Sequence, residues 1–458
     1  MVRMKKDYLE MMRRGDALSL PQLLTMIVRL SIPTMLAQVS FIIMEYVDAS
    51  MVGRLGANAT AAIGLVASST WLFGGLLNCS TIGFSVQSSQ YLGAGDEVSA
   101  RRILRQGLVG TALFSTLLLV IGAAIHRFLP VWLGGEAAIV HDAGMYFLIF
   151  ALSLPFNQFN NFAAGMLQST GNMRTPGLLD VLLCALNVGF NYVFIYLCHL
   201  GVAGAALGTA LSEVVIAVPM GVALLVKSPM LHLRKSERLV WNRAELKRAF
   251  RIALPVGFEQ VVMCSAQVMQ TAIVAPLGSV AIAANSLAVT AEALCYMPGY
   301  GIAAAATAMI GQSIGAKRAD LTRRLSWVIT LFGMAIMGVG GAAMYFAAPV
   351  MMRLLTPVAE IVVLGAAMLK IEAFAEPLFG ASIVATGVFR GAGDTLVPSV
   401  MNLISMWAVR IPLAAVMAPR IGLKGVWIAM CTELCFRGII FLIRLYQKQG
   451  KEQKRERI

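Results

Sequence analysis

Apolar stretches of about 20 residues follow one another along almost the whole chain, and this feature limits the fold more than any other. The 458 residues are 58% hydrophobic and 13% charged, with a mean hydropathy of +0.77. Soluble domains carry about 25% charged residues. An apolar helix of about 20 residues spans the hydrocarbon of a bilayer. The pattern therefore predicts an all-α membrane protein with about twelve transmembrane helices.

Short polar loops separate the predicted spans. In the first half of the chain the spans lie near residues 24–51, 60–87, 104–125, 143–167, 177–197 and 203–226. In the second half they lie near residues 250–276, 281–311, 326–350, 361–389, 398–418 and 425–445.

Basic residues are concentrated in every second loop, and they account for the formal net charge of +14. Arg101 and Arg102 follow the second predicted span, and Lys317 and Arg318 follow the eighth. Loops rich in Lys and Arg stay on the cytoplasmic side of a membrane. We therefore predict a multi-pass protein of the cell (inner) membrane with both termini in the cytoplasm, and we expect no nucleic-acid partner.

Landmarks of the first half recur 222 positions later in the second half. The matching pairs are Pro33 and Pro255, Gln90 and Gln312, Arg101 and Arg323, Gly171 and Gly393, and Pro176 and Pro398. Six spans per repeat place both halves in the membrane with the same orientation. The repeat predicts two pseudo-symmetric six-helix bundles, an architecture typical of transporters.

The repeat also predicts where the domains begin and end. We expect an N-terminal lobe over residues 1–226 that includes a cytoplasmic leader over residues 1–22. A cytoplasmic linker over residues 227–251 would join it to a C-terminal lobe over residues 252–446, and residues 447–458 would form a basic cytoplasmic tail. Transporters of this design bind substrate between their repeats, so we predict a substrate cleft between the lobes of a functional monomer.

Ionisable residues at membrane depth are costly, and they commonly mark ion or substrate pathways. Glu45 and Asp48 lie three residues apart and share one helix face. Asp180, Asn187 and Asn191 also share one face of their span. Carboxylate and amide oxygens suit a hard cation, and a desolvated carboxylate equally suits a proton. The spacing predicts a site for H⁺ or Na⁺ in the first half.

Three acids are the candidates for coupling or substrate binding in the second half. Glu259 follows Pro255 by four residues, and Glu376 directly precedes Pro377, so both lie at predicted helix breaks. Glu292 has no evident partner nearby in the sequence. The cysteines and histidines lack the spacing of metal ligands, so we expect no cofactor and no metal other than a Na⁺ ion near Asp48.

Several motifs, in this order and spacing, resemble the multidrug and toxic compound extrusion (MATE) family over essentially the whole chain. The motifs are VDASMVGRLG, QYLGAGD, LNVGFNYVFIY, LGVAGAALGTALSE, GQSIGAKR and FRGAGDT. The resemblance implies a secondary transporter and not an enzyme. It implies that organic cationic or amphiphilic compounds are exported by alternating access, in exchange for H⁺ or Na⁺ (multidrug efflux).

The resemblance also assigns candidate residues. It implies that Asp48 works with polar groups at Asn187, Asn191 and Thr209, and Asn161 is a further match. Some relatives have aspartate at the position of Asn191, so the second acid of their site is absent here.

Two other functions share parts of this pattern. A lipid-linked oligosaccharide flippase of the same superfamily would need basic residues for a pyrophosphate. Lys370, Arg410 and Arg437 all lie in the second half, where structural ion pairs would account for them. Lys370 can pair with Glu372 or Glu376 on its own span, and Arg410 with an acid on a neighbouring span. An intramembrane aspartyl protease would explain the two GAGD motifs that end at Asp96 and Asp394, but both motifs border basic loops.

Overall fold

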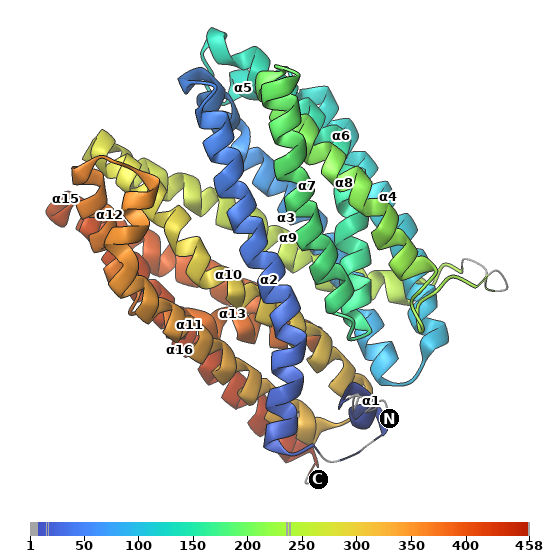
Figure 1. Ribbon diagram of the computed structural model, residues 1–458. Coiled ribbons are helices and arrows are strands. Elements are labelled where there is room, and N and C mark those ends of the chain that lie inside the picture. Colours follow the sequence, from blue (N-terminus) through green and yellow to red (C-terminus); the bar gives the residue numbers. More distant parts are fainter. Residues whose placement is uncertain (1–7, 15, 17, 235–236, 238–239, 457–458) are drawn as a thin grey trace, which may run out of the picture. The chain divides into compact units, whose positions relative to one another are not determined.

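The structure is a computed structural model that describes residues 8–14, 16, 18–234, 237 and 240–456. Within this part of the chain every regular element is a helix (Figure 1). The first half contains α1 (Tyr8–Arg14), α2 (Leu20–Gly53), α3 (Ala57–Gly93), α4 (Glu97–Ile125), α5 (Leu129–Trp132), α6 (Ala137–Ser169), α7 (Arg174–Tyr192), the π-helix η1 (Val193–Leu197) and α8 (Gly201–Leu225). The second half contains α9 (Arg243–Val274), the 3₁₀-helix η2 (Ala275–Leu277), α10 (Ser279–Gly315), α11 (Ala319–Leu355), α12 (Ala359–Glu372), α13 (Glu376–Gly391), α14 (Leu396–Ile404), the π-helix η3 (Ser405–Arg410), α15 (Ile411–Ile421) and α16 (Leu423–Glu456).

Among the described residues, 11 helical segments are long and apolar enough to cross a membrane. These segments coincide with eleven of the predicted spans. The remaining predicted span, near residues 361–389, is the pair α12 and α13, which a short turn divides. Pro377 lies just after the break and has no N–H to donate to the carbonyl of Ala373, one turn earlier. Proline alone does not divide the helix, because Pro155, 222 positions earlier, lies inside the continuous α6. The all-α transmembrane fold is confirmed.

The helix boundaries of the two halves follow the predicted offset of 222 positions. Helix α10 begins and ends 222 positions after α3, and α11 begins 222 positions after α4. Residues with positive φ are repeated as well: Gly56 (φ 114°) matches Gly278 (φ 97°), and Gly171 (φ 91°) matches Gly393 (φ 76°). The two halves therefore share loop geometry as well as hydropathy.

The helices group into two compact units. One unit comprises residues 39–257, and in it α6 packs against α3, α4 and α8. The other unit comprises the described residues up to Gln38 and those from Phe258 onward, and in it α12 and α13 pack against α10, α11 and α16. The same neighbours therefore surround the repeat-related helices in each unit.

The start of α2 packs with the second half of the chain, which hydropathy alone did not indicate. The Thr34 hydroxyl donates a hydrogen bond of 2.8 Å to the carbonyl of Gly301. A Cβ at Gly301 would lie 2.6 Å from the backbone nitrogen of Met35, so the backbones of α2 and α10 are in close contact. The structure also begins α9 at Arg243 and continues α16 to Glu456, so parts of the predicted linker and tail are helical.

Small residues allow equally close packing between α13 and α10. A Cβ added at Gly387 would overlap the carbonyl oxygen of Ala303, and one added at Gly391 would lie 2.5 Å from that of Thr307. The Thr307 hydroxyl donates across the interface to the carbonyl of Gly387 at 3.0 Å. This arrangement of small residues and interhelical hydrogen bonds is typical of membrane helix pairs.

We predict that Gly387→Ala destabilises the protein by about 1–3 kcal/mol, the usual effect of overpacking. The added methyl group must push α13 away from α10. The melting temperature of the purified protein in detergent measures the effect. Gly74→Ala is the control, because a Cβ at Gly74 has no neighbour within 4 Å. Equal melting temperatures for both variants would contradict the packing described above.

The segment between α8 and α9 is held by an ion-pair network around Glu237. Arg101, which is 2% exposed, donates to Glu237 at 2.9 Å, and Arg105 donates to it at 2.5 Å. Burial opposes ionisation of Glu237, but the hydrogen bonds from Arg105 and Arg101 outweigh that effect and hold its pKa below the ordinary value. A lowered pKa stabilises the fold above the pKa of the unfolded chain, and this contribution is lost as the pH falls through the folded-state pKa.

We predict that Glu237→Gln lowers the melting temperature at pH 7.5, because it leaves the buried Arg101 with a weaker partner. The difference from the unmodified protein should begin to shrink below the ordinary pKa of a glutamate, where the unfolded chain is protonated, and should be lost as the pH falls through the lowered pKa of Glu237 in the folded protein. Melting curves across this pH range test the prediction. The exposed Glu136→Gln serves as control, and a pH-independent difference would be the contrary result.

Candidate functional site

Asp48 lies in a chain of polar side chains in the 39–257 unit, which we call the Asp48 cluster: Asp48, Asn187, Asn191 and Thr209. The Asn191 amide nitrogen donates to Asp48 Oδ1 at 2.8 Å and to Asn187 Oδ1 at 3.0 Å. The Asn187 amide nitrogen donates to Thr209 Oγ1 at 2.9 Å. Three helices, α2, α7 and α8, therefore contribute to one hydrogen-bonded group.

The local fold explains how these side chains meet. Asn187 and Asn191 lie one turn apart on α7, so they share a face. A Cβ at Gly208 would overlap Asn191 Oδ1, so the absence of a side chain there leaves room for the amide beside α8. The π-helix η1 begins two residues after Asn191, and π-turns inside helices are frequent at functional sites.

The cluster has an unused acceptor. Asn187 and Asn191 are almost fully buried, and Asn191 Oδ1 has no hydrogen-bond partner among the described residues. An unpaired buried oxygen beside a carboxylate is costly. Such oxygens can coordinate a hard cation, and they can accept a hydrogen bond from a protonated carboxyl group. The donor set therefore suits Na⁺ or H⁺ chemically.

Glu45 and Asp180 do not join this hydrogen-bonded chain. Glu45 lies one turn before Asp48 on α2 and is half-buried, as is Asp48. Neither Glu45 nor Asp180 has a hydrogen bond to another residue in the part of the chain that the structure describes. Asp180 has Glu213 as its charged neighbour. Their predicted part in coupling stays a prediction.

Asn161 belongs to a second polar network, centred on Glu213. The Asn157 and Asn160 amides donate to the two carboxylate oxygens of Glu213 at 2.8 and 2.6 Å. Asn161 donates to Asn157 at 2.8 Å and so reaches Glu213 only indirectly. Glu213 follows Thr209 by four residues on α8, and this spacing is the sequence signal that could have linked the two networks.

Glu259 is a fully engaged carboxylate in the second unit. It accepts hydrogen bonds of 2.6 Å from the Ser399 hydroxyl and from the Asn402 amide. Arg390 lies 3.9 Å away. These contacts join α9 to α14, so the structure gives Glu259 a helix-connecting position apart from the other second-half acids.

Glu292 and Glu376 do come together, with a third acid, Glu372, that the sequence suggested only as a partner of Lys370. Glu292, Glu372 and Glu376 are buried, and each offers one carboxylate oxygen within 4.8 Å of the others. We call this group the three-glutamate cluster. The pairing of Lys370 with Glu372 or Glu376 was wrong: Lys370 Nζ lies over the Tyr345 ring, 5.6 Å from its centroid. The pairing of Arg410 with a neighbouring span is confirmed, because Arg410 contacts Glu433 at 2.7 Å.

A family model described as MatE matches residues 33–193 and 255–416. The chain belongs to the MatE family. Its members are transporters, so this MatE protein is a multi-pass membrane transporter and not an enzyme. The family needs no cofactor for transport.

Individual relatives agree with this assignment. The chain is 28% identical over 449 residues to the "Probable multidrug resistance protein NorM" of Thermotoga maritima, with 95% of this chain and 94% of that protein covered. A crystal structure of MATE in complex with MaD3S matches with a TM-score of 0.91 at 22% identity, over 98% of this chain and 100% of that chain. The outward-facing conformation of a multidrug resistance MATE family transporter of the MOP superfamily matches with a TM-score of 0.90 at 22% identity, over 94% of this chain and 96% of that chain. These structures confirm the fold.

The two GAGD motifs of this MatE protein have structural roles. Asp96 caps α4 by accepting a hydrogen bond from the Ser99 N–H at 3.0 Å. Asp394 accepts from Arg444 at 2.7 Å and from Lys448 at 3.3 Å, both on α16. Each aspartate is therefore used locally in its own unit. The protease interpretation was wrong.

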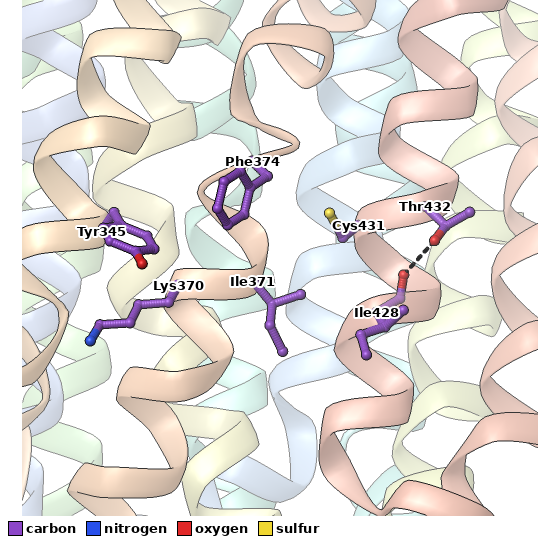
Figure 2. A pocket seen from close by; sticks show the side chains of 7 residues that line it. All are labelled: Tyr345, Lys370, Ile371, Phe374, Ile428, Cys431 and Thr432. Atoms are coloured by element: carbon purple, nitrogen blue, oxygen red, sulfur yellow. Dashed lines mark hydrogen bonds between the residues drawn. The ribbon is translucent and has the colours of Figure 1, made fainter.

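A pocket of about 380 Å³ lies between α11, α12 and α16 of the second unit (Figure 2). Its lining is Tyr345, Lys370, Ile371, Phe374, Ile428, Cys431 and Thr432. Figure 2 shows the Lys370 side chain extending from α12 toward Tyr345 and away from Ile371. None of the predicted site residues lines this pocket, so the polar clusters and not this pocket form the candidate site.

We predict that Gly208→Ala disrupts the Asp48 cluster, because the new methyl group must displace the Asn191 amide. Loss of a hydrogen bond to a charged group costs about 1.5 kcal/mol, so ion-dependent transport should weaken by roughly tenfold in apparent ion affinity. Transport by protein reconstituted in vesicles measures this. The matched control is Gly189→Ala on α7, where a Cβ has no neighbour within 4 Å. An unchanged ion dependence in Gly208→Ala would contradict the geometry.

Proposed function

We propose that this MatE protein exports organic cationic or amphiphilic compounds in exchange for H⁺ or Na⁺, and that the Asp48 cluster holds the coupling ion. One observation carries the proposal: Asp48 is bonded to Asn191, whose amide oxygen is buried and unpaired. The name of the Thermotoga maritima relative supports multidrug export. The resemblance of the Asp48, Asn187, Asn191 and Thr209 positions to the family pattern supports ion coupling.

The mechanism follows from the cost of leaving the cluster incomplete. A cation or proton that enters from outside satisfies Asn191 Oδ1 and the Asp48 carboxylate together. The ion can drive transport only if it binds one conformation more tightly than the other. The cluster joins α2, α7 and α8, so binding favours the arrangement in which these three helices are held together. Release of the ion to the cytoplasm then favours the alternative arrangement.

The charge distribution supports the proposed orientation. The loops that follow the second and eighth predicted spans are basic, as is the tail, and positive loops remain in the cytoplasm. We propose that both termini are cytoplasmic, that the protein resides in the cell (inner) membrane and that it functions as a monomer.

The flippase alternative gains no support from the buried basic residues. Arg410 and Arg437 both contact Glu433, at 2.7 and 3.0 Å. Lys370 lies over Tyr345. A pyrophosphate needs basic groups that are free to bind it, and the two buried arginines already neutralise a carboxylate.

We predict that Asp48→Asn abolishes ion-dependent efflux of a fluorescent organic cation from vesicles, because the isosteric amide cannot carry the charge that the ion neutralises. A Na⁺ gradient and a pH gradient are imposed in separate experiments, and the gradient that drives efflux in the unmodified protein identifies the ion. Asp142→Asn, at an exposed position on α6, is the control and should transport normally. Efflux that persists in Asp48→Asn under both gradients would refute the proposal.

A further inference from the structure

The three-glutamate cluster is the most unusual group of charges in the second unit. Glu292 comes from α10, Glu372 ends α12, and Glu376 begins α13. Their exposed fractions are 5%, 0% and 0%. One carboxylate oxygen of each lies within 4.8 Å of the other two. Three buried carboxylates this close cannot all be ionised unless a positive charge lies among them.

Two of the three carboxylates lack hydrogen-bond donors. Neither oxygen of Glu372 or of Glu376 receives a hydrogen bond from an N–H or O–H group of the described residues. The Cys295 thiol, a weak donor, is the polar group beside Glu376. Other buried acids of the protein, such as Glu259 and Glu213, are bonded on both oxygens. The cluster is therefore set apart by oxygens that the protein itself does not satisfy.

The fold holds the carboxylates in this position. The break before Pro377 places Glu372 and Glu376 on either side of a turn while keeping them four residues apart. A Cβ at Gly341 would lie 2.8 Å from Cβ of Glu376, so α11 presses directly against the start of α13. Lys370, the nearest basic residue in the sequence, extends to Tyr345 and forms no salt bridge with a described carboxylate (Figure 2).

The charges around the cluster leave a deficit of two positive charges. Arg410 and Glu433 lie within electrostatic reach of Glu372. Arg410 and Arg437 both pair with Glu433, so this group carries one net positive charge. The three glutamates carry three negative charges when ionised. A divalent cation would neutralise the whole assembly, whereas a monovalent ion would leave it negative inside an apolar medium.

We propose that the three-glutamate cluster binds one divalent hard cation of the size of Ca²⁺. A point between three oxygens no more than 4.8 Å apart lies at most about 2.8 Å from each, and Ca²⁺ binds oxygens at 2.3–2.6 Å in flexible geometry. Small side-chain adjustments therefore suffice. Mg²⁺ demands a smaller, octahedral site. This site is separate from the Asp48 cluster and does not depend on the proposed efflux.

Calcium binding by the full-length protein tests the proposal. The protein is purified in detergent, freed of divalent metal with a chelator and titrated with Ca²⁺ alone in an isothermal calorimeter. We expect one saturable site per chain. In the Glu372→Gln, Glu376→Gln double variant the dissociation constant should rise at least about tenfold, because even indirect damage to a metal site costs 10- to 100-fold in affinity.

Matched variants locate the site. Glu360→Gln removes an exposed acid from the same helix, α12, and should bind Ca²⁺ normally. Asp48→Asn should also keep the calcium site, and this result separates the site from the proposed coupling function. Glu372→Asp keeps the negative charge but shortens the side chain by one methylene, which moves the carboxylate away from the ion. This variant should fold and bind Ca²⁺ more weakly, even if the double variant misfolds.

Three results would overturn the proposal. The first is no saturable calcium binding by the unmodified protein, which would mean that protons alone neutralise the cluster. The second is equal affinity in the unmodified protein, Glu372→Asp and the double variant. The third is displacement of Ca²⁺ by equimolar Na⁺, which would contradict the charge count.

Discussion

The fold depends on one constraint: a polar group inside the bilayer must find its partner within the chain. Helices meet this constraint for the backbone, and every regular element of the described chain is a helix. The same constraint acts on side chains. Glu213 is bonded to Asn157 and Asn160, Glu259 to Ser399 and Asn402. These satisfied carboxylates connect helices and stabilise each unit.

Several buried polar atoms depart from this rule, among them Gln87 Oε1, Gln106 Oε1 and Asn160 Oδ1, and some of the departures lie in the two candidate clusters. Asn191 Oδ1 is buried and unpaired beside Asp48, and the oxygens of Glu372 and Glu376 lack donors. An unsatisfied buried acceptor costs about 1–3 kcal/mol, and more when it is charged, as a carboxylate is. A ligand that pairs with these oxygens removes this cost when it binds. Glu372 and Glu376 differ in this respect from Glu213 and Glu259, whose carboxylate oxygens all accept hydrogen bonds.

The two halves of the chain are alike in backbone and different in chemistry. The helices α3, α4 and α8 around α6 correspond to α10, α11 and α16 around α12 and α13. In the first half α6 is continuous through Pro155, while in the second half the corresponding segment is divided into α12 and α13 just before Pro377. That break holds Glu372 and Glu376 together. The repeat therefore gives both halves the same arrangement of helices, and different residues at matching positions give the two different polar clusters.

The sequence by itself determined the helices, their membrane character and the repeat, because hydropathy and a fixed offset of 222 positions can be read along the chain. It also selected Asp48, Asn187, Asn191 and Thr209, which the structure joins by hydrogen bonds.

Other features needed the tertiary structure. Glu372 was not a candidate, Glu259 proved to be a connecting group, and Lys370 turned away from its expected partners. Periodicity places a side chain on a face of its own helix, but which helix lies opposite is decided by packing between segments far apart in the chain. Only the structure could therefore show that α10, α12 and α13 bring three carboxylates together.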